Sequence, residues 1–148
     1  MIWKPNTTVA AVLELDGKFL LVEENTSQGD LFNQPAGHLE PGESLVEGAI
    51  REALEESAYT FEPKTLIGIY QWRTQNTTYL RFAFTGPILS HDPQRKLDTG
   101  IIRAIWLSPD EIRAEKNRHR SPMVCQCIED YLDGRRYPLD IITHWEDA

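Results

Sequence analysis

The segment Ser44–Ser57 carries the clearest helix pattern in the sequence and does most to restrict how the chain can fold. Its first residues, Ser-Leu-Val-Glu, fit a capping box, in which the side chains of Ser44 and Glu47 bond each other's backbone N–H. The helix is therefore predicted to begin at Ser44. At about 100° per residue, its apolar residues share one side, which we expect to face a core. They are Val46, Ala49, Ile50, Ala53 and Leu54.

Three glutamates occupy a neighbouring face of the same helix. Glu55 and Glu56 lie on either side of Glu52, each within about 60° of it. Like charges at this spacing destabilise a helix by about 0.2–0.5 kcal/mol per pair, and the helix dipole disfavours anions near the C-terminus. A divalent cation with oxygen ligands would offset this clustering. From the glutamates alone, a solvated acidic face is the alternative.

The rest of the chain is predicted to be mainly strands and turns, with two further helices. Strands are expected at Thr7–Leu15, Lys18–Glu24, Leu66–Arg73, Tyr79–Thr85 and Arg103–Leu107, and Asp16-Gly17 is a hairpin turn. Loops are expected at Asn25–Glu43 and Gly86–Gly100. Ser-Pro pairs indicate helix starts at Ser108 and over Ser121–Leu132. This order predicts an α/β layered domain.

Length and composition favour one globular domain over residues 1–148. The hydrophobic content of 41% and charged content of 26% are ordinary for such a domain. No apolar run approaches the ~20 residues of a membrane span, and the N-terminus lacks a signal-peptide pattern. Cys125 and Cys127 are too few for a disulfide framework and are expected to be ordinary thiols. We therefore expect a cytoplasmic protein without a membrane partner.

The net charge of -8 and the lack of a basic stripe both argue against a nucleic-acid partner, because clustered basic residues bind the phosphates along a strand. A small anionic substrate is still compatible with this charge, since a bound divalent cation can reverse the sign of one pocket. The excess of acidic residues otherwise favours solubility.

The glutamate helix is part of a longer pattern with fixed spacing. Gly37 is followed after five residues by Glu43, and after seven more by Arg51-Glu52-Ala53-Leu54-Glu55-Glu56. This pattern resembles the signature of the Nudix hydrolases, which closes with a Gly and an apolar residue. Here Tyr59 matches the apolar position, whereas Ala58 stands where the family usually has Gly. Because a Gly there would suit a left-handed helix end, Ala would cost about 1–2 kcal/mol in that conformation.

The Nudix resemblance implies a fold, a metal and a set of site residues. The fold would be a mixed β-sheet sandwiched between helices, with a loop–helix–loop catalytic motif. Glu52, Glu55 and Glu56 would hold Mg²⁺, with Mn²⁺ as the alternative, together with the backbone carbonyl of Gly37. Arg51 is expected to form an ion pair with Glu43 that ties the loop to the helix and aims Glu52.

Several further stretches resemble the NudJ branch of that family. They are Asn33–Glu40, Gln71-Trp72, Leu80-Arg81-Phe82, Arg120-Ser121-Pro122 and Arg135–Leu139. This resemblance implies hydrolysis of nucleoside di- and triphosphates, hydroxymethylpyrimidine pyrophosphate and thiamine pyrophosphate. Separately, we expect a monomer, with a dimer as the alternative. A Nudix-fold nucleotide-binding or sensor domain without catalysis is the competing hypothesis. A Ca²⁺-binding helix–loop–helix is a poorer one, because no stretch has its alternating Asp or Asn ligands.

A general base is expected from a loop downstream of the helix, as in other members of the family. Asp98 is the favoured candidate and Asp92 the second, and a residue making turn contacts is the alternative for either. Gly48 could leave room for metal or phosphate, or could simply be tolerated. Glu111 is better explained as a capping residue than as a catalytic one.

The remaining polar and aromatic candidates each have a structural alternative. His38 and His119 could donate hydrogen bonds. Arg113, Lys116, Arg118 and Arg120 could touch phosphates or form a solvated helix end. Trp72, Tyr79 and Trp106 could stack on a base, although core or sheet packing is the default for aromatic residues.

Overall fold

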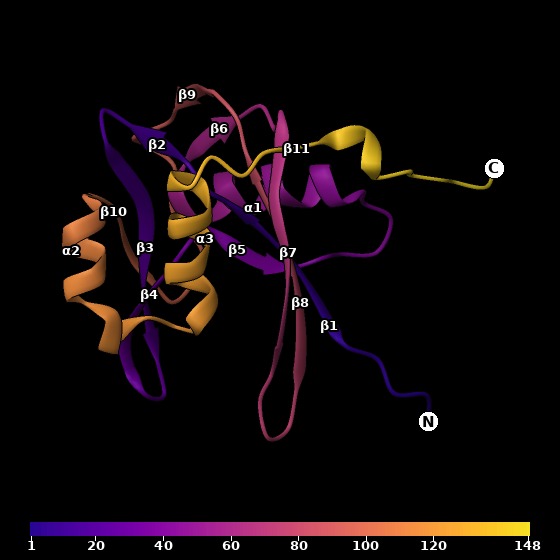
Figure 1. Cartoon of the computed structure of the whole chain (residues 1–148), viewed down its shortest axis with the longest axis horizontal. Coiled ribbons are helices and arrows are strands. Elements are labelled where there is room, and N and C mark those ends of the chain that lie inside the picture. The colour runs from indigo at the N-terminus through magenta and orange to yellow at the C-terminus, as the bar shows by residue number, and fades with distance from the viewer.

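A mixed five-stranded sheet forms the centre of the structure, a computed structural model that describes residues 1–148 (Figure 1). Its strands run in the order β11-β7-β8-β1-β5, and β1 and β8 are parallel whereas the other neighbours are antiparallel. The strands are β1 (Asn6–Ala11), β5 (Ala36–His38), β7 (Thr65–Arg73), β8 (Thr78–Thr85) and β11 (Tyr137–Pro138).

A second sheet is antiparallel and packs beside the first. It contains β2 (Glu14–Leu15), β3 (Lys18–Thr26), β4 (Gly29–Asn33) and β10 (Ile101–Leu107). Two short strands, β6 (Tyr59–Phe61) and β9 (Ile88–His91), form a separate pair. The helices are α1 (Leu45–Ser57), α2 (Pro109–Ala114) and α3 (Pro122–Leu132), with 3₁₀ turns at Lys116–Arg118 and Leu139–Ile141.

Alternating residues of β1 point into two cores, one on each side of the mixed sheet. Val9 and Ala11 pack in a cluster with Ala49 and Ala53 of α1. Ala10, between them, packs in a cluster that includes residues of α3 and β3. The central sheet therefore lies between helices, as the sequence predicted. No helix of the structure is both long and apolar enough to cross a membrane.

The capping box of α1 is present as predicted, but the buried side of this helix is rotated toward the glutamates. Ala49 and Ala53 are fully buried and Glu52 is buried with them, whereas Leu54 is only half-buried. The prediction placed Leu54 on the core side. It is wrong because β1 and β5 meet the helix along the line of Ala49, Glu52 and Ala53, which draws one glutamate inward.

Four strand predictions need correction. The predicted strand Thr7–Leu15 is divided, because its backbone leaves β8 and crosses to β3, where Leu13 O accepts from Leu20 N. The predicted loop Asn25–Glu43 contains β4 and β5, and the predicted loop Gly86–Gly100 contains β9. Short β6 was not predicted at all. These strands are short, and β4 and β5 are rich in Gly, Asn, Asp and His, so local propensity does not reveal pairing that the neighbouring strands impose.

Candidate active site

The carboxylate of Glu52 lies directly against the backbone of Gly37. A Cβ atom on Gly37 would stand 2.3 Å from Glu52 Oε1, closer than any side chain allows. Gly37 pairs with Val9 in the sheet, so its position is fixed by β1. Glycine at this position leaves space for the glutamate where it lies, and two of the four residues predicted as metal ligands are thereby brought together.

Arg51 holds the loop before α1 and two of the helix glutamates at once. Its Nε and Nη2 donate to the two oxygens of Glu43 at 2.9 and 2.7 Å, which is the ion pair predicted from the sequence. Its Nη1 donates to Glu52 Oε1 at 2.6 Å and to Glu55 Oε1 at 3.0 Å. Hydrogen bonding to Arg51 lowers the pKa of Glu43, and hydrogen bonding to Glu43 raises the pKa of Arg51. The guanidinium therefore stays charged and Glu43 ionised.

Glu56 reaches the start of β5, where its Oε1 accepts from the backbone N–H of Ala36 at 3.0 Å. It has no ion-pair partner. Burial raises the pKa of Glu56 to about 8, against the lowering effect of the Ala36 hydrogen bond, and the charges of Glu24, Glu52 and Asp98 raise it further. Burial also raises the pKa of Glu52, against the lowering effect of Arg51. Both carboxylates thus favour a nearby cation or proton.

Asp98 lies beside the C-terminal end of α1, whereas the Asp92 side chain bonds elsewhere. Asp98 N donates to Glu55 O at 3.0 Å, and the Asp98 charge contributes to the raised pKa of Glu52 and of Glu56. The Asp92 carboxylate instead accepts from Gln94 N at 3.0 Å within its own turn. Of the two candidate bases, Asp98 is the one next to the glutamates.

These carboxylates suit a divalent cation, although in this structure they do not form a complete metal site. No group of three or more Asp, Glu, His or Cys side chains has the geometry of a metal site. Arg51 Nη1 donates to one oxygen each of Glu52 and Glu55. The chemistry of the group still fits Mg²⁺, because the Glu52 carboxylate lies against the Gly37 backbone and Glu56, bonded to Ala36 N, has no cation as a partner.

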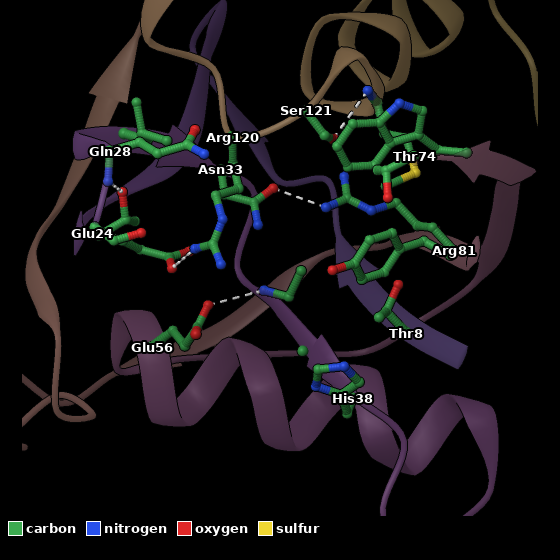
Figure 2. A pocket seen from close by; sticks show the side chains of 18 residues that line it. Thr8, Glu24, Gln28, Asn33, His38, Glu56, Thr74, Arg81, Arg120 and Ser121 are labelled. Carbon is green, nitrogen blue, oxygen red and sulfur yellow. Dashed lines mark hydrogen bonds and ion pairs between the residues drawn. The ribbon is translucent and has the colours of Figure 1, made fainter. Parts of the chain in front are cut away.

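A cavity of about 460 Å³ opens from Glu56 and Gly37 across the face of the mixed sheet (Figure 2). Glu56 and Arg81 lie on different sides of it. Arg120 borders it and pairs with Glu24 at 2.6 Å. The cavity is therefore acidic where it meets α1, and guanidinium groups line other parts of its wall.

Sequence reasoning missed part of this cavity wall. Glu24, Asn33 and Arg81 line the cavity although none was singled out as a site residue. Asn33 and Arg81 were named only within stretches that resemble the NudJ branch, and no periodicity places them together, because β3, β4 and β8 meet only through the two sheets. Trp72 and Tyr79, by contrast, were candidates for ring stacking and do line the cavity.

Other candidates have structural roles. The space above Gly48 is filled, since a Cβ there would meet Glu43 Oε1 at 2.9 Å, so the proposal that it leaves room for metal or phosphate is wrong. Glu111 completes the predicted capping box with Ser108. His119 is held by the carbonyl of Ile112, and Trp106 donates to the hydroxyl of Tyr59.

The basic run predicted to touch phosphates or form a solvated helix end consists of Arg113, Lys116, Arg118 and Arg120. Arg113 pairs with Glu129 and Arg118 with Glu23, both away from the cavity lining. Only Arg120 of this run faces the cavity, where His38 is also found. Cys125 and Cys127 are free thiols, as expected.

Comparison with known proteins matches this architecture. The family model described as the NUDIX domain matches residues 4–127. Phosphatase NudJ from Escherichia coli strain K12 is 42% identical over 142 residues, covering 95% of this chain and 92% of that protein. The chain belongs to the Nudix hydrolase family.

Solved structures agree. A NUDIX hydrolase from Nitrosomonas europaea is 57% identical with a TM-score of 0.94, covering 98% of this chain and 100% of that one. A MutT protein from Methanosarcina mazei Go1 has a TM-score of 0.73 at 24% identity, covering 91% and 99%, and shares the Nudix fold.

The Nudix assignment and the NudJ resemblance confirm two predictions made from the sequence. This Nudix hydrolase is an enzyme of the pyrophosphohydrolase or phosphatase type, and not a domain that only binds or senses nucleotides. Its substrate is a small molecule that contains phosphate, and Nudix hydrolases generally use divalent metal ions.

Proposed function

We propose that this enzyme hydrolyses phosphoanhydride bonds of nucleoside di- and triphosphates, and of related pyrophosphates such as hydroxymethylpyrimidine pyrophosphate and thiamine pyrophosphate, with Mg²⁺ or Mn²⁺. The observation that carries the proposal is the position of Glu56 and Gly37 in the wall of an open cavity, with the Glu52 carboxylate directly against Gly37. Asp98 lies next to this helix, where its backbone N–H bonds Glu55 O. The 42% identity to a phosphatase over nearly the whole chain supports the same substrate class.

The residues that would hold the metal are Glu52, Glu55 and Glu56, with the backbone carbonyl of Gly37. A bound Mg²⁺ would supply positive charge that shields and orients the phosphate oxygens. Arg51 keeps Glu52 and Glu55 at the same place by bonding both, while its other nitrogens fix it to Glu43. Arg51 is therefore a positioning residue in this scheme, because its donors are used within the protein.

Asp98 would act as the general base. Its carboxylate would accept a proton from the water that attacks phosphorus, and the bridging oxygen would leave with the rest of the substrate. The backbone bond from Asp98 N to Glu55 O fixes the loop at the end of α1, close to the glutamates. Asp98 is exposed to solvent, so the accepted proton can return to water.

Product release tests the proposal directly. The protein is incubated with cytidine triphosphate and, separately, cytidine diphosphate, with Mg²⁺, with Mn²⁺ or with a chelator, and phosphate and pyrophosphate are quantified separately. We expect phosphate from both nucleotides, released one group at a time, and none in the chelator. Pyrophosphate as the only inorganic product from the triphosphate would contradict the NudJ-like reaction. Equal rates with chelator would contradict the metal requirement.

A further inference from the structure

Two aromatic side chains line the cavity at a place that phosphate hydrolysis does not require. Trp72 of β7 and Tyr79 of β8 are directly paired in the sheet, and their rings are stacked with centroids 5.5 Å apart and planes inclined by 20°. Both rings border the cavity and both are only half-buried. Aromatic surface left open beside a polar cavity suits stacking of a planar ring of a ligand.

Arg81, on the same strand as Tyr79, is a buried cation with neutral partners. Its side chain borders the cavity, yet the residue is only 3% exposed. Nη1 donates to Gln34 Oε1 at 2.7 Å, and Nη2 donates to Asn33 Oδ1 at 2.8 Å. No carboxylate forms an ion pair with it. Burying an uncompensated charge is unfavourable, so this arrangement indicates a role that simple packing does not supply.

The Arg81 guanidinium also keeps hydrogens to donate. Nη1 donates to both Gln34 and Cys127, and Nε is buried without a partner, whereas Nη2 uses one of its two hydrogens on Asn33 and keeps the other. A guanidinium is a planar donor group that matches adjacent oxygen or nitrogen acceptors. Carbonyl oxygens and ring nitrogens on the edges of nucleobases are acceptors of this kind.

The sheet register separates Arg81 from the acidic end of the cavity. Thr8 of β1 pairs with Arg81 on one side and with His38 of β5 on the other. At about 4.8 Å per strand, Arg81 therefore lies roughly 10 Å from β5. Glu56 bonds the first residue of β5, so a linker between ring and phosphate has room to cross the intervening strand.

We propose that Trp72, Tyr79 and Arg81 form a subsite for the ring of the substrate, a planar nitrogen heterocycle with carbonyl or ring-nitrogen acceptors. The ring stacks on the aromatic pair while Arg81 donates to an acceptor on its edge. This inference rests on the proposed function, because a ring bound there directs its phosphates toward Glu56. Selectivity for the organic half of the substrate then depends on β7 and β8, not on the glutamate helix.

Binding of a nucleoside tests the subsite without any hydrolysis. Cytidine, which carries no phosphate, is titrated by calorimetry in a chelating buffer against wild type, Trp72→Leu and Trp145→Leu. We expect saturable binding to wild type and at least fivefold weaker binding to Trp72→Leu. Trp145 is 84% exposed in the C-terminal tail, so its variant is a matched control that should bind as wild type does. No binding to wild type, or equal loss in both variants, would overturn the subsite.

Kinetics with two diphosphates test the role of Arg81. Cytidine diphosphate carries ring acceptors, whereas benzyl diphosphate carries a ring without them. We expect wild type to prefer cytidine diphosphate at least tenfold in kcat/KM, and Arg81→Lys to reduce that preference at least fivefold. Equal kcat/KM for both substrates in wild type would overturn the Arg81 assignment, even if the variant does not fold. Cytidine binding without hydrolysis of any diphosphate would instead overturn the proposed function and leave the subsite standing.

Discussion

At the N-terminus of α1, Glu47 N donates to Ser44 Oγ at 3.0 Å and Ser44 N donates to Glu47 Oε1 at 2.8 Å, so backbone groups are satisfied locally and near solvent. The C-terminal half instead gathers three glutamates, buries one of them and ends in a left-handed alanine. Charge at that end opposes the helix dipole, and no basic residue occupies the last turn. The same helix therefore follows local rules at one end and departs from them at the other.

This difference separates stability from chemistry along one element. Changes near Ser44 should lower the free energy of unfolding while leaving kcat of the folded enzyme unchanged. Changes around Glu52 and Glu56 should lower activity while leaving stability equal or higher. The predictions below test whether the two ends divide in this way.

Asp98→Asn should give the largest effect. Its backbone bond to Glu55 O is retained, so α1 keeps its neighbour, whereas the proton acceptor is lost. We expect kcat to fall by roughly 10²–10⁴-fold with little change in KM, and the acidic limb of the pH–rate profile to disappear. Steady-state kinetics between pH 5 and pH 9 measure both.

Asp92→Asn is the matched control, because an Asn oxygen can still accept from Gln94 N in the same turn. A small change in rate with the acidic limb intact is expected. If Asp92→Asn instead gives the large loss, Asp92 is the base. If neither variant matters, the proton acceptor is one of the helix glutamates.

Glu56→Gln should separate activity from stability most clearly. Gln can still accept from Ala36 N but is no longer an anionic ligand, so kcat should fall by about two orders of magnitude, or roughly 3 kcal/mol in the barrier. Burial raises the pKa of Glu56 from 4.5 to about 8 in the metal-free fold. The folded state therefore binds this proton more tightly, and wild-type stability falls as the pH rises from about 4.5 to about 8.

Urea unfolding in a chelating buffer at pH 5 and pH 9 measures that stability difference. From pH 5 to pH 9, the free energy of unfolding of Glu56→Gln should rise by about 1 kcal/mol or more relative to that of wild type, because Gln does not titrate. Glu47→Gln is the control at the other end of α1, where hydrogen bonds from Ser44 lower the pKa of the carboxyl. Its difference from wild type should stay the same at the two pH values, because a carboxyl with a lowered pKa is ionised at both. A Glu56→Gln variant that loses stability at pH 9 would contradict the comparison.

Gly37→Ala should move Glu52 without removing it. The added Cβ would stand 2.3 Å from Oε1, and a carboxylate at the end of a flexible side chain can shift where a backbone could not. We expect about a tenfold loss of kcat/KM, a higher metal concentration at half-maximal rate, and a free energy of unfolding within about 1 kcal/mol of wild type. Unchanged metal dependence would show that the position of Glu52 against Gly37 is not needed.

Sequence patterns predicted those parts of the fold whose signals are local. The capping boxes at Ser44 and Ser108 and the hairpin at Asp16-Gly17 involve residues within four positions of each other, and all are present. The divided strand Thr7–Leu15 could not be seen, because the crossing depends on where β8 and β3 lie. Strand β5 is set by pairing with β1, and its own Ala-Gly-His sequence has little strand propensity.

The candidate site shows the same limit. Glu52, Glu55 and Glu56 follow from helical spacing, and Arg51 with Glu43 follows from the fixed distance along the family pattern. The ring subsite does not, because Trp72 and Arg81 meet only through the pairing of β7 with β8, and Asn33 arrives from the second sheet. Side chains that become neighbours only through sheet formation leave no periodicity in the sequence.

Ser44→Ala tests the N-terminal end of α1. Losing the hydroxyl that accepts from Glu47 N should cost about 1 kcal/mol in the free energy of unfolding. Activity per folded molecule should be unchanged, because Ser44 lies at the opposite end from the glutamates. Urea unfolding and kcat measured on the same sample check both, and a fall in kcat would show that the two ends are coupled.

Ala58→Gly tests the C-terminal end and should have the smallest effect. Ala58 has φ 64° and ψ 13°, and a left-handed alanine costs about 1–2 kcal/mol that glycine does not incur. Its methyl group is also buried, at 3% exposure, and losing it removes about 0.8 kcal/mol of apolar burial. The two contributions oppose each other, so the net gain in unfolding free energy should be about 0.5 kcal/mol.

The sign of the Ala58→Gly effect decides whether the end of α1 is strained. A small gain with unchanged kcat would show that the left-handed end is tolerated and is not needed for the chemistry. A net loss would show that packing of the methyl group outweighs backbone strain. A fall in kcat would have a different meaning, because Asp92 N donates to Ala58 O and Asp98 N to Glu55 O. The exit of the helix would then help to place the loop that carries the proposed base.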